Sequence, residues 1–214
     1  MAPTPLEKMV QEQIQARGVS DPRVLAAMQQ IPREQFIPQN IQHHAFADRP
    51  LPIGHGQTIS QPYIVAYMCD KLDIDVSHRV LEIGTGCGYH GAVLSKLASQ
   101  VYSIEILEPL ALQAKQTTLE LALTHLTIHT GDGQLGWPEQ APFDRISVAA
   151  ATPTLPQAWI DQLAEGGKMI VPMGNPHHHQ TLMLYEKIQG HLQAHPLLPV
   201  SFVPLTSSQT HHTL

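Results

Sequence analysis

Three glycines follow a short apolar run in the segment VLEIGTGCGY, where an acid precedes them. Gly84, Gly86 and Gly88 come directly after the expected strand RVLEI, which contains Glu82. Because glycine has no Cβ, such a turn lets the polar tail of a ligand approach bare backbone. A second acid, Glu105, ends the next expected strand 21 residues after Gly84 (105 − 84 = 21), where a carboxylate can accept both hydroxyls of a ribose. The pattern predicts a site for an adenosine-bearing ligand.

Several kinds of adenosine ligand share these features, and position 89 separates them. The dinucleotide fingerprint requires a third glycine there, but this chain has Tyr89. A large aromatic side chain would block the close helix approach that a pyrophosphate needs. No Lys-Ser or Lys-Thr pair follows, so the turn is not a phosphate loop. The third expected strand ends in GDG, which places Asp132 near the adenine amine.

A polar segment, PIGHGQTISQP at residues 52–62, precedes the first obvious strand. It offers only Ile53 and Ile59 for burial, so the pattern predicts a long loop delivered onto a helix N-terminus near residues 60–62. Backbone N–H groups at such an end favour an anion. A surface linker is the simpler interpretation, and a binding loop is the functional one.

The elements that must position these residues fall into three parts of one domain, residues 1–214. Residues 1–75 read as helices followed by the polar loop; Gly18 ends the first helix and Ser20 caps the second. Residues 78–174 alternate strand and helix, which is typical of a doubly wound, mostly parallel sheet. In that part LPQAWIDQLAEGG reads as a helix stopped by glycine. Residues 180–206 read as a C-terminal antiparallel strand pair.

Composition excludes several classes of function. The 214 residues carry a net charge of −6 with a pI near 6.1, which argues against a nucleic-acid binder. No apolar run approaches the roughly 18 residues of a membrane span, and the first residues do not resemble a signal peptide. Two cysteines make no disulfide framework. A cytoplasmic protein without membrane or nucleic-acid partners is expected.

Five segments together resemble those of a known enzyme family: PLPIGHGQTISQP, VLEIGTGCGY, GDG, APFD and LPQAWIDQLAEGGKMIVPMG. The Gly-x-Gly-x-Gly spacing after an acid resembles the first motif of class I S-adenosylmethionine-dependent methyltransferases. The full set resembles the protein-L-isoaspartate (D-aspartate) O-methyltransferase family over nearly the whole chain. IPREQFIP and FVPL also stand where that family has similar segments. The GQTISQP segment narrows the resemblance from methyltransferases in general to this family.

The resemblance implies a Rossmann-like class I methyltransferase fold and an S-adenosyl-L-methionine cofactor, with S-adenosyl-L-homocysteine as product. The implied reaction is methyl esterification of L-isoaspartyl carboxyl groups in damaged proteins and peptides. The ester would then close to a succinimide that hydrolyses partly to aspartate. The family is commonly monomeric, and acceptance of D-aspartyl sites stays open.

The same resemblance assigns roles to residues. Ser60 orients the substrate carboxylate beside the methyl donor, while Gln57, Thr58 and Ile59 line the loop and shield the cofactor. The implied cofactor contacts are Glu82, Gly84, Thr85, Gly86 and Gly88 at the methionine part, Glu105 at the ribose, Asp132 and Gly133 at the adenine, and Thr206 where a C-terminal strand closes over the site.

The residue types suit this chemistry. A carboxyl group with a pKa of about 4 is already ionised at neutral pH, so no general base is needed. The protein must supply an in-line approach, which can contribute roughly 7–11 kcal/mol, and must exclude water. A neutral serine suits this better than an arginine, which would hold the carboxylate more tightly and lower its nucleophilicity.

A few features depart from the family or leave alternatives. Cys87 stands where the family most often has serine; it reads as packing, although a thiol near a helix N-terminus can have a lowered pKa and be oxidised. Adjacent histidines 177–179 cannot all face one metal ion, so a solvated loop and no metal are expected. His55 lies in the polar loop, with a possible role in substrate binding. The alternatives are another class I methyltransferase with a small-molecule or RNA acceptor, and a non-catalytic S-adenosylmethionine-binding module.

Overall fold

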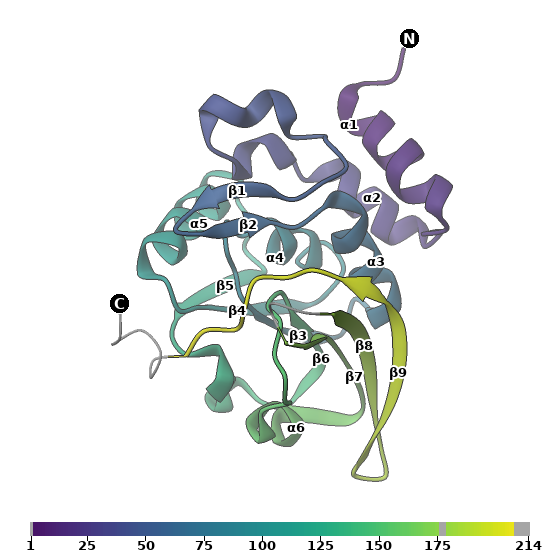
Figure 1. Ribbon diagram of the computed structural model, residues 1–214, viewed down its shortest axis with the longest axis vertical. Helices are drawn as coiled ribbons and strands as arrows, with labels where there is room; N and C mark the ends of the chain where they lie inside the picture. The colour runs from purple at the N-terminus through teal and green to yellow at the C-terminus, as the bar shows by residue number, and fades with distance from the viewer. Residues whose placement is uncertain (1, 176–178, 208–214) are drawn as a thin grey trace.

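The computed structural model describes residues 2–175 and 179–207 (Figure 1). The helices are α1 (Pro5–Lys8), α2 (Pro22–Gln30), α3 (Pro62–Leu72), α4 (Tyr89–Leu94), α5 (Glu108–Glu120) and α6 (Gln157–Gln162). The strands are β1 (Leu51–Gly54), β2 (Gln57–Ile59), β3 (Arg79–Ile83), β4 (Gln100–Glu105), β5 (Leu126–Thr130), β6 (Phe143–Val148), β7 (Leu163–Gly174), β8 (Gln180–Ile188) and β9 (His191–Val200). None of the helices in these described ranges is long and apolar enough to cross a membrane.

Seven of the described strands form one sheet in the order β5-β4-β3-β6-β7-β8-β9. The strands from β5 to β7 run parallel, and β8 and β9 continue the sheet as an antiparallel pair. The predicted fold class is confirmed, including the C-terminal pair. The order reverses between β3 and β6, so the chain leaves these two strands in opposite directions. A crevice is expected outside their carboxyl ends.

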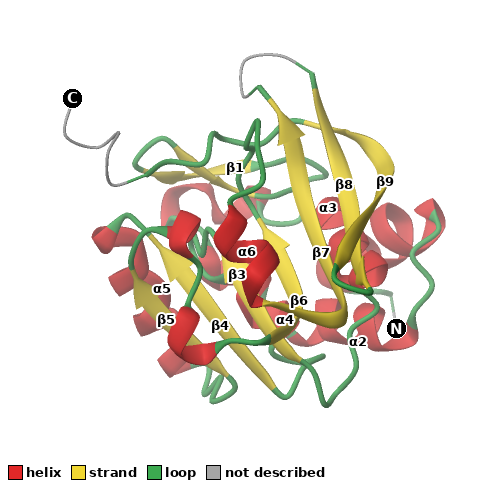
Figure 2. Ribbon diagram, turned by 90° about the horizontal axis from the view of Figure 1, so that it is seen from below, coloured by secondary structure: helices red, strands yellow, loops and turns green. Residues whose placement is uncertain are grey.

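Helices cover both faces of the sheet, with α6 on one face and α3, α4 and α5 on the other (Figure 2). The central strands are therefore buried on both sides. Along β3, Val80 packs into the core under α3 to α5, whereas Leu81 and Ile83 pack into the core under α6. This period of two places every second side chain in a different core. Continuous apolar strands such as RVLEI follow from that double burial.

The predicted N-terminal helical extension is present, and it packs against α3. α1 continues through a π-helical stretch (Met9–Ile14) and a short 3-10 turn, and Gly18 ends it with φ of 97°. The predicted cap of α2 was one residue off: the Asp21 carboxylate, not the Ser20 hydroxyl, accepts the backbone N–H of Arg23 at 2.8 Å. Asp21 directly precedes Pro22, which fixes the first helical φ, so the cap falls there.

The polar segment ahead of α3 is a β-hairpin and not the irregular loop expected from its glycines and prolines. β1 and β2 pair antiparallel, with Leu51 opposite Ile59. His55 and Gly56 form the turn with φ of 51° and 69°, a conformation suited to two-residue hairpin connections. Leu51, Ile53 and Ile59 are buried. The hairpin thus has an apolar inner side and delivers the chain to the start of α3.

The helix expected over LPQAWIDQLAEGG is shorter than predicted, because strand pairing takes over its second half. α6 ends at Gln162, and Leu163 pairs with Phe143 as the first residue of β7. The Lys187 ammonium donates to the carbonyls of Ile160 and Leu163, both at 2.8 Å. This cation satisfies carbonyls at the end of the helix, which the predicted glycine stop was expected to do.

Residues 201–207, which we call the strap, cross the carboxyl edge of the sheet after β9 (Figure 1). Backbone hydrogen bonds join Ala151 to the strap: its N–H donates to the carbonyl of Val203, and its carbonyl accepts from Leu205, both at 2.8 Å. The buried Gln180 side chain accepts from the N–H of Phe202 at 2.7 Å and donates to its carbonyl at 3.0 Å. Hydrogen bonds therefore hold the strap at Phe202, Val203 and Leu205.

Candidate functional site

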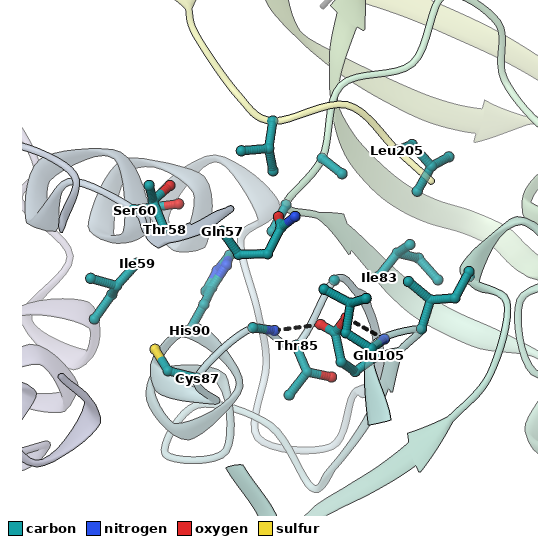
Figure 3. Close-up of a pocket in the computed structure, with 18 of the residues that line it drawn as sticks. Gln57, Thr58, Ile59, Ser60, Ile83, Thr85, Cys87, His90, Glu105 and Leu205 are labelled. Carbon is teal, nitrogen blue, oxygen red and sulfur yellow. Dashed lines mark hydrogen bonds between the residues drawn. The ribbon is translucent and has the colours of Figure 1, made fainter. Parts of the chain in front are cut away.

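A cavity lies at the carboxyl edge of β3, β4 and β6, between the hairpin, the glycine turn and the strap (Figure 3). Six segments of the chain supply its walls. The lining residues are Gln57, Thr58, Ile59, Ser60, Val65, Ile83, Gly84, Thr85, Gly86, Cys87, Tyr89, His90, Ile104, Glu105, Ile106, Leu107, Gly133, Ala149, Ala150, Val203, Pro204, Leu205 and Thr206. The crevice expected from the strand order is therefore present as a cavity lined by side chains and backbone.

Glu105 is the acidic side chain on this wall, and the backbone holds it in place. One carboxylate oxygen accepts the N–H of Gly86 at 2.7 Å, and the other accepts the N–H of Leu107 at 2.9 Å (Figure 3). Burial raises the pKa of Glu105, and its hydrogen bonds from backbone N–H groups oppose that shift. A carboxylate has about four lone-pair sites, so two accepted N–H bonds leave capacity for a pair of ribose hydroxyls.

Most residues predicted for the site come together in this cavity. The predicted residues that line it are Gln57, Thr58, Ile59, Ser60, Gly84, Thr85, Gly86, Glu105, Gly133 and Thr206. Three others, Glu82, Gly88 and Asp132, lie outside the lining. Each of the three supports a wall instead of forming it.

Glu82 lies beneath the glycine turn and is fully buried. It accepts the Ser103 hydroxyl at 2.5 Å, and the Ser103 and Thr85 hydroxyls are themselves 2.5 Å apart. Burial raises the pKa of Glu82 to about 8, although the Ser103 hydrogen bond opposes that shift. A protonated Glu82 at neutral pH therefore supports Thr85 through Ser103, and Glu82 does not itself line the cavity.

Replacing this carboxyl group tests its protonation state through the pH dependence of folding. An acid whose pKa is raised to about 8 in the folded protein binds a proton that the unfolded chain has already lost above about pH 4.5. The free energy of unfolding is therefore expected to fall by at most about 1.4 kcal/mol per pH unit as the pH rises from about 4.5 to about 8. The variant Glu82→Gln should lack this decline. Urea titrations of both proteins at several pH values measure it, and parallel pH curves would contradict the assignment.

Gly88 and Asp132 also act as supports. Gly88 is the N-cap of α4 with φ of 90°, and a Cβ there would meet the Ala114 side chain of α5 at 3.2 Å. The glycine thus permits close helix packing under the turn. The Asp132 carboxylate accepts the N–H of Gln134 at 2.9 Å and caps the turn that presents Gly133 to the cavity.

Two lining residues that sequence reasoning misjudged or missed are Cys87 and His90. Burial raises the pKa of the Cys87 thiol to about 11, so the expected lowering by the helix N-terminus is wrong in direction. His90 was not predicted at all, and burial lowers its pKa to about 4. The ring is therefore uncharged at neutral pH, and it adds no positive charge to the cavity wall.

The histidines at positions 177–179 lie only partly within the described residues. His177 and His178 lie outside the described residues. Within residues 2–175 and 179–207, no group of three or more His, Cys, Asp or Glu side chains is placed to hold a metal ion. His55 forms the hairpin turn and lines neither cavity.

A second cavity of about 370 Å³ adjoins the first on its outer side. Its lining is Pro50, Thr58, Ser60, Gln61, Ile64, Ala149, Pro199, Val200, Ser201, Phe202 and Val203. Among these described lining residues there is no charged side chain. Thr58, Ser60, Ala149 and Val203 belong to both cavities, so Ser60 stands where the two meet. We call the second cavity the outer groove.

The strap contributes to both cavities, so its anchor should affect binding. In Gln180→Ala, the N–H and carbonyl of Phe202 lose the partners described above, which is expected to cost roughly 1–3 kcal/mol of stability. The freed strap should raise the Kd for S-adenosylhomocysteine severalfold. Calorimetry measures the Kd, and urea unfolding measures the stability. An unchanged Kd in a destabilised variant would show that the strap does not need this anchor to close the cavity.

The sheet order, the glycine turn and the acid at the end of β4 define the class I methyltransferase fold. A family model described as "Protein-L-isoaspartate(D-aspartate) O-methyltransferase" matches residues 5–210. The chain belongs to this family.

Relatives and solved structures agree with the family match. A protein-L-isoaspartate O-methyltransferase of Opitutus terrae is 50% identical over 200 residues, covering 94% of this chain and 86% of that protein. One from Methanoculleus marisnigri is 50% identical over 199 residues, covering 93% and 90%.

Among solved structures, a protein-L-isoaspartate O-methyltransferase superimposes with a TM-score of 0.87 at 31% identity, covering 94% of this chain and 66% of that longer chain. A Plasmodium falciparum structure named for the same activity, in complex with S-adenosyl-L-homocysteine, has a TM-score of 0.82 at 26% identity, covering 93% and 97%.

Proposed function

We propose that this protein transfers a methyl group from S-adenosyl-L-methionine to the free α-carboxylate of an L-isoaspartyl residue in a damaged protein or peptide. The product ester closes to a succinimide and so begins repair towards aspartate. The observation that carries the proposal is the position of Ser60, on the wall shared by the inner cavity and the uncharged outer groove. Family membership supports the same reaction.

The inner cavity fits S-adenosyl-L-methionine by the chemistry of its walls. The bare glycine turn at Gly84 and Gly86 offers backbone to the polar methionine part, and the Glu105 carboxylate is preset for two hydroxyls. Apolar side chains, among them Ile104 and Leu107, are suited to flank an adenine ring. When bound, the cofactor supplies an electrophilic methyl group on a sulfonium centre.

The residues of the chain orient the acceptor and exclude water. The Ser60 hydroxyl is placed to donate to one oxygen of the acceptor carboxylate, which leaves the other oxygen free to attack. The neutral His90 ring and the absence of charged side chains among the described residues of the outer groove keep the acceptor carboxylate from being held by a cation. Hydrogen bonding by a neutral donor preserves nucleophilicity, and the strap and hairpin screen the meeting point from water.

The outer groove indicates what surrounds the acceptor group. Ile64, Val200 and Phe202 give it an apolar wall, and Ser201 and Gln61 provide polar groups. An extended peptide of varied sequence fits such a groove better than a compact charged metabolite does. We propose protein and peptide acceptors for this groove, and a single chain that works in the cytoplasm.

The test pairs two synthetic peptides that differ only in carrying L-isoaspartate or L-aspartate at one site. Each is incubated with the protein and methyl-labelled S-adenosylmethionine at slightly acid pH, where the ester survives. We expect base-labile label on the isoaspartyl peptide alone. Label on neither peptide, with S-adenosylhomocysteine binding still seen by calorimetry, would support a non-catalytic binding module or another acceptor. Equal label on both peptides would refute selectivity for isoaspartate.

A further inference from the structure

We propose that Arg33 is a positioning residue that places Ser60 for methyl transfer; the proposal rests on the function proposed above. Arg33 is completely buried between the N-terminal helical layer and the hairpin. Its Nε donates to the carbonyl of Ala45 at 2.9 Å, and its Nη2 donates to the carbonyl of Ser60 at 2.8 Å. One side chain thus holds the peptide unit that follows the serine of the shared wall.

The two carbonyls bracket the whole acceptor segment. Ala45 lies before the hairpin and Ser60 lies after it, so the guanidinium closes the base of the loop that includes residues 46–59. A guanidinium presents its donors in a rigid planar fork, which fixes two acceptors relative to each other. A lysine ammonium on a flexible stem cannot fix both in this way.

A third contact joins the Arg33 guanidinium to a residue that lines the inner cavity. The Arg33 guanidinium carbon lies 4.8 Å from the centre of the Tyr89 ring. Tyr89 is the first residue of α4, directly after the glycine turn, and it lines the inner cavity. The same side chain therefore contacts the segment that carries Ser60 and the element that shapes the methyl-donor site.

The energetics favour a positional role over a purely stabilising one. The Nη1 atom of Arg33 is buried and has no hydrogen-bond partner among the described residues. Within the same residues Arg33 forms no salt bridge. Burying a cation with such incomplete pairing is costly. The presence of the cation is better explained by its hydrogen bonds to the Ala45 and Ser60 carbonyls, which it holds in fixed positions.

The variant Arg33→Met separates position from stability. We expect it to fold with a Tm lower than that of the wild type, because the carbonyls of Ala45 and Ser60 lose their donor, and to bind S-adenosylhomocysteine with nearly unchanged Kd. We expect kcat for the isoaspartyl peptide to fall by about 100-fold, the scale of a misplacement near 1 Å. Amide hydrogen exchange at residues 57–60 should become faster. Arg33→Lys keeps the charge and can reach one carbonyl, so its kcat should lie between those of the wild type and Arg33→Met.

Arg145 provides a matched control. It is also a buried arginine that donates to backbone carbonyls, those of Leu72 at 2.5 Å, Asp144 at 2.8 Å and Asp73 at 3.0 Å, but it lines neither cavity. Arg145→Met should change the Tm and leave kcat close to that of the wild type.

Three results would overturn the proposal. One is a folded Arg33→Met protein with wild-type kcat and unchanged exchange in the hairpin. The second is an equal loss of kcat in Arg145→Met, which would make the loss a general consequence of altered stability. The third result applies if Arg33→Met does not fold. In that case Arg33→Lys is the test, and a wild-type kcat in Arg33→Lys would overturn the proposal. A wild-type protein that fails to methylate the isoaspartyl peptide refutes the proposed function instead, so the two failures are distinct.

Discussion

The variant Ser60→Ala should bind S-adenosylhomocysteine as tightly as the wild type and lose methyl transfer by about 100- to 1,000-fold, the usual effect of removing one hydrogen-bond donor at a reacting centre. The reason is geometric, since Ser60 lies at the junction of the inner cavity and the outer groove. Without the hydroxyl, the acceptor carboxylate keeps its charge but loses its orientation. Stopped assays of labelled ester at saturating cofactor measure kcat, and calorimetry measures the Kd.

Ser95→Ala is a suitable control for this prediction. The Ser95 hydroxyl is buried and donates to the carbonyl of Ala92 at 2.7 Å within the last turn of α4, away from both cavities. Its loss should reduce stability slightly and leave kcat unchanged. Near-normal transfer by Ser60→Ala would mean that another group orients the acceptor, and the proposed role of Ser60 would be abandoned.

The second large effect is expected at Glu105, the proposed acceptor of the ribose hydroxyls. Glu105→Gln should weaken S-adenosylhomocysteine binding about 10- to 100-fold, equivalent to roughly 1.5–3 kcal/mol for hydrogen bonds to a charged group. The new amide would also turn an NH₂ group towards the N–H of Gly86 or of Leu107, since Glu105 accepts both. Because burial already raises the pKa of Glu105, removal of its charge should be tolerated by the fold.

Glu120→Gln is the matched control for Glu105. Glu120 is exposed near the end of α5, where its carboxylate accepts the Gln116 side chain at 2.6 Å. The Kd of this variant should equal that of the wild type. At saturating cofactor, Glu105→Gln should recover most of the wild-type kcat. A kcat that stays low at saturation would show that Glu105 affects transfer itself and not only binding.

The sequence predicted the sheet well because its signals are local. Buried strands such as RVLEI and FDRISV are short apolar runs, and the turn at Gly84 and Gly86 follows directly from one of them. The end of β4 at Glu105 was predicted from spacing alone. Each of these features depends on residues that are neighbours in the chain, so composition and period were sufficient.

The supporting contacts were not predictable in the same way. Whether Glu82 faces the ligand or lies under the turn depends on Ser103, which belongs to another strand. The raised pKa of Cys87 depends on burial that no local pattern reports. The strap joins Ala151 to residues beyond β9, and Arg33 reaches Ser60 across the hairpin. Contacts of this kind require three-dimensional packing, which a single sequence does not display.

The order of the strands has a consequence for biosynthesis. The inner cavity takes its walls from residues as early as Gln57 and as late as Thr206. The last wall, Val203 to Thr206, follows β9, the edge strand that pairs only after β8 is in place. A nascent chain can form the glycine turn while it is still attached to the ribosome, but it lacks the strap until these residues have emerged from the exit tunnel. A competent methyl-donor site therefore forms only after the strap has emerged, and stalled chains ending at β9 should be inactive.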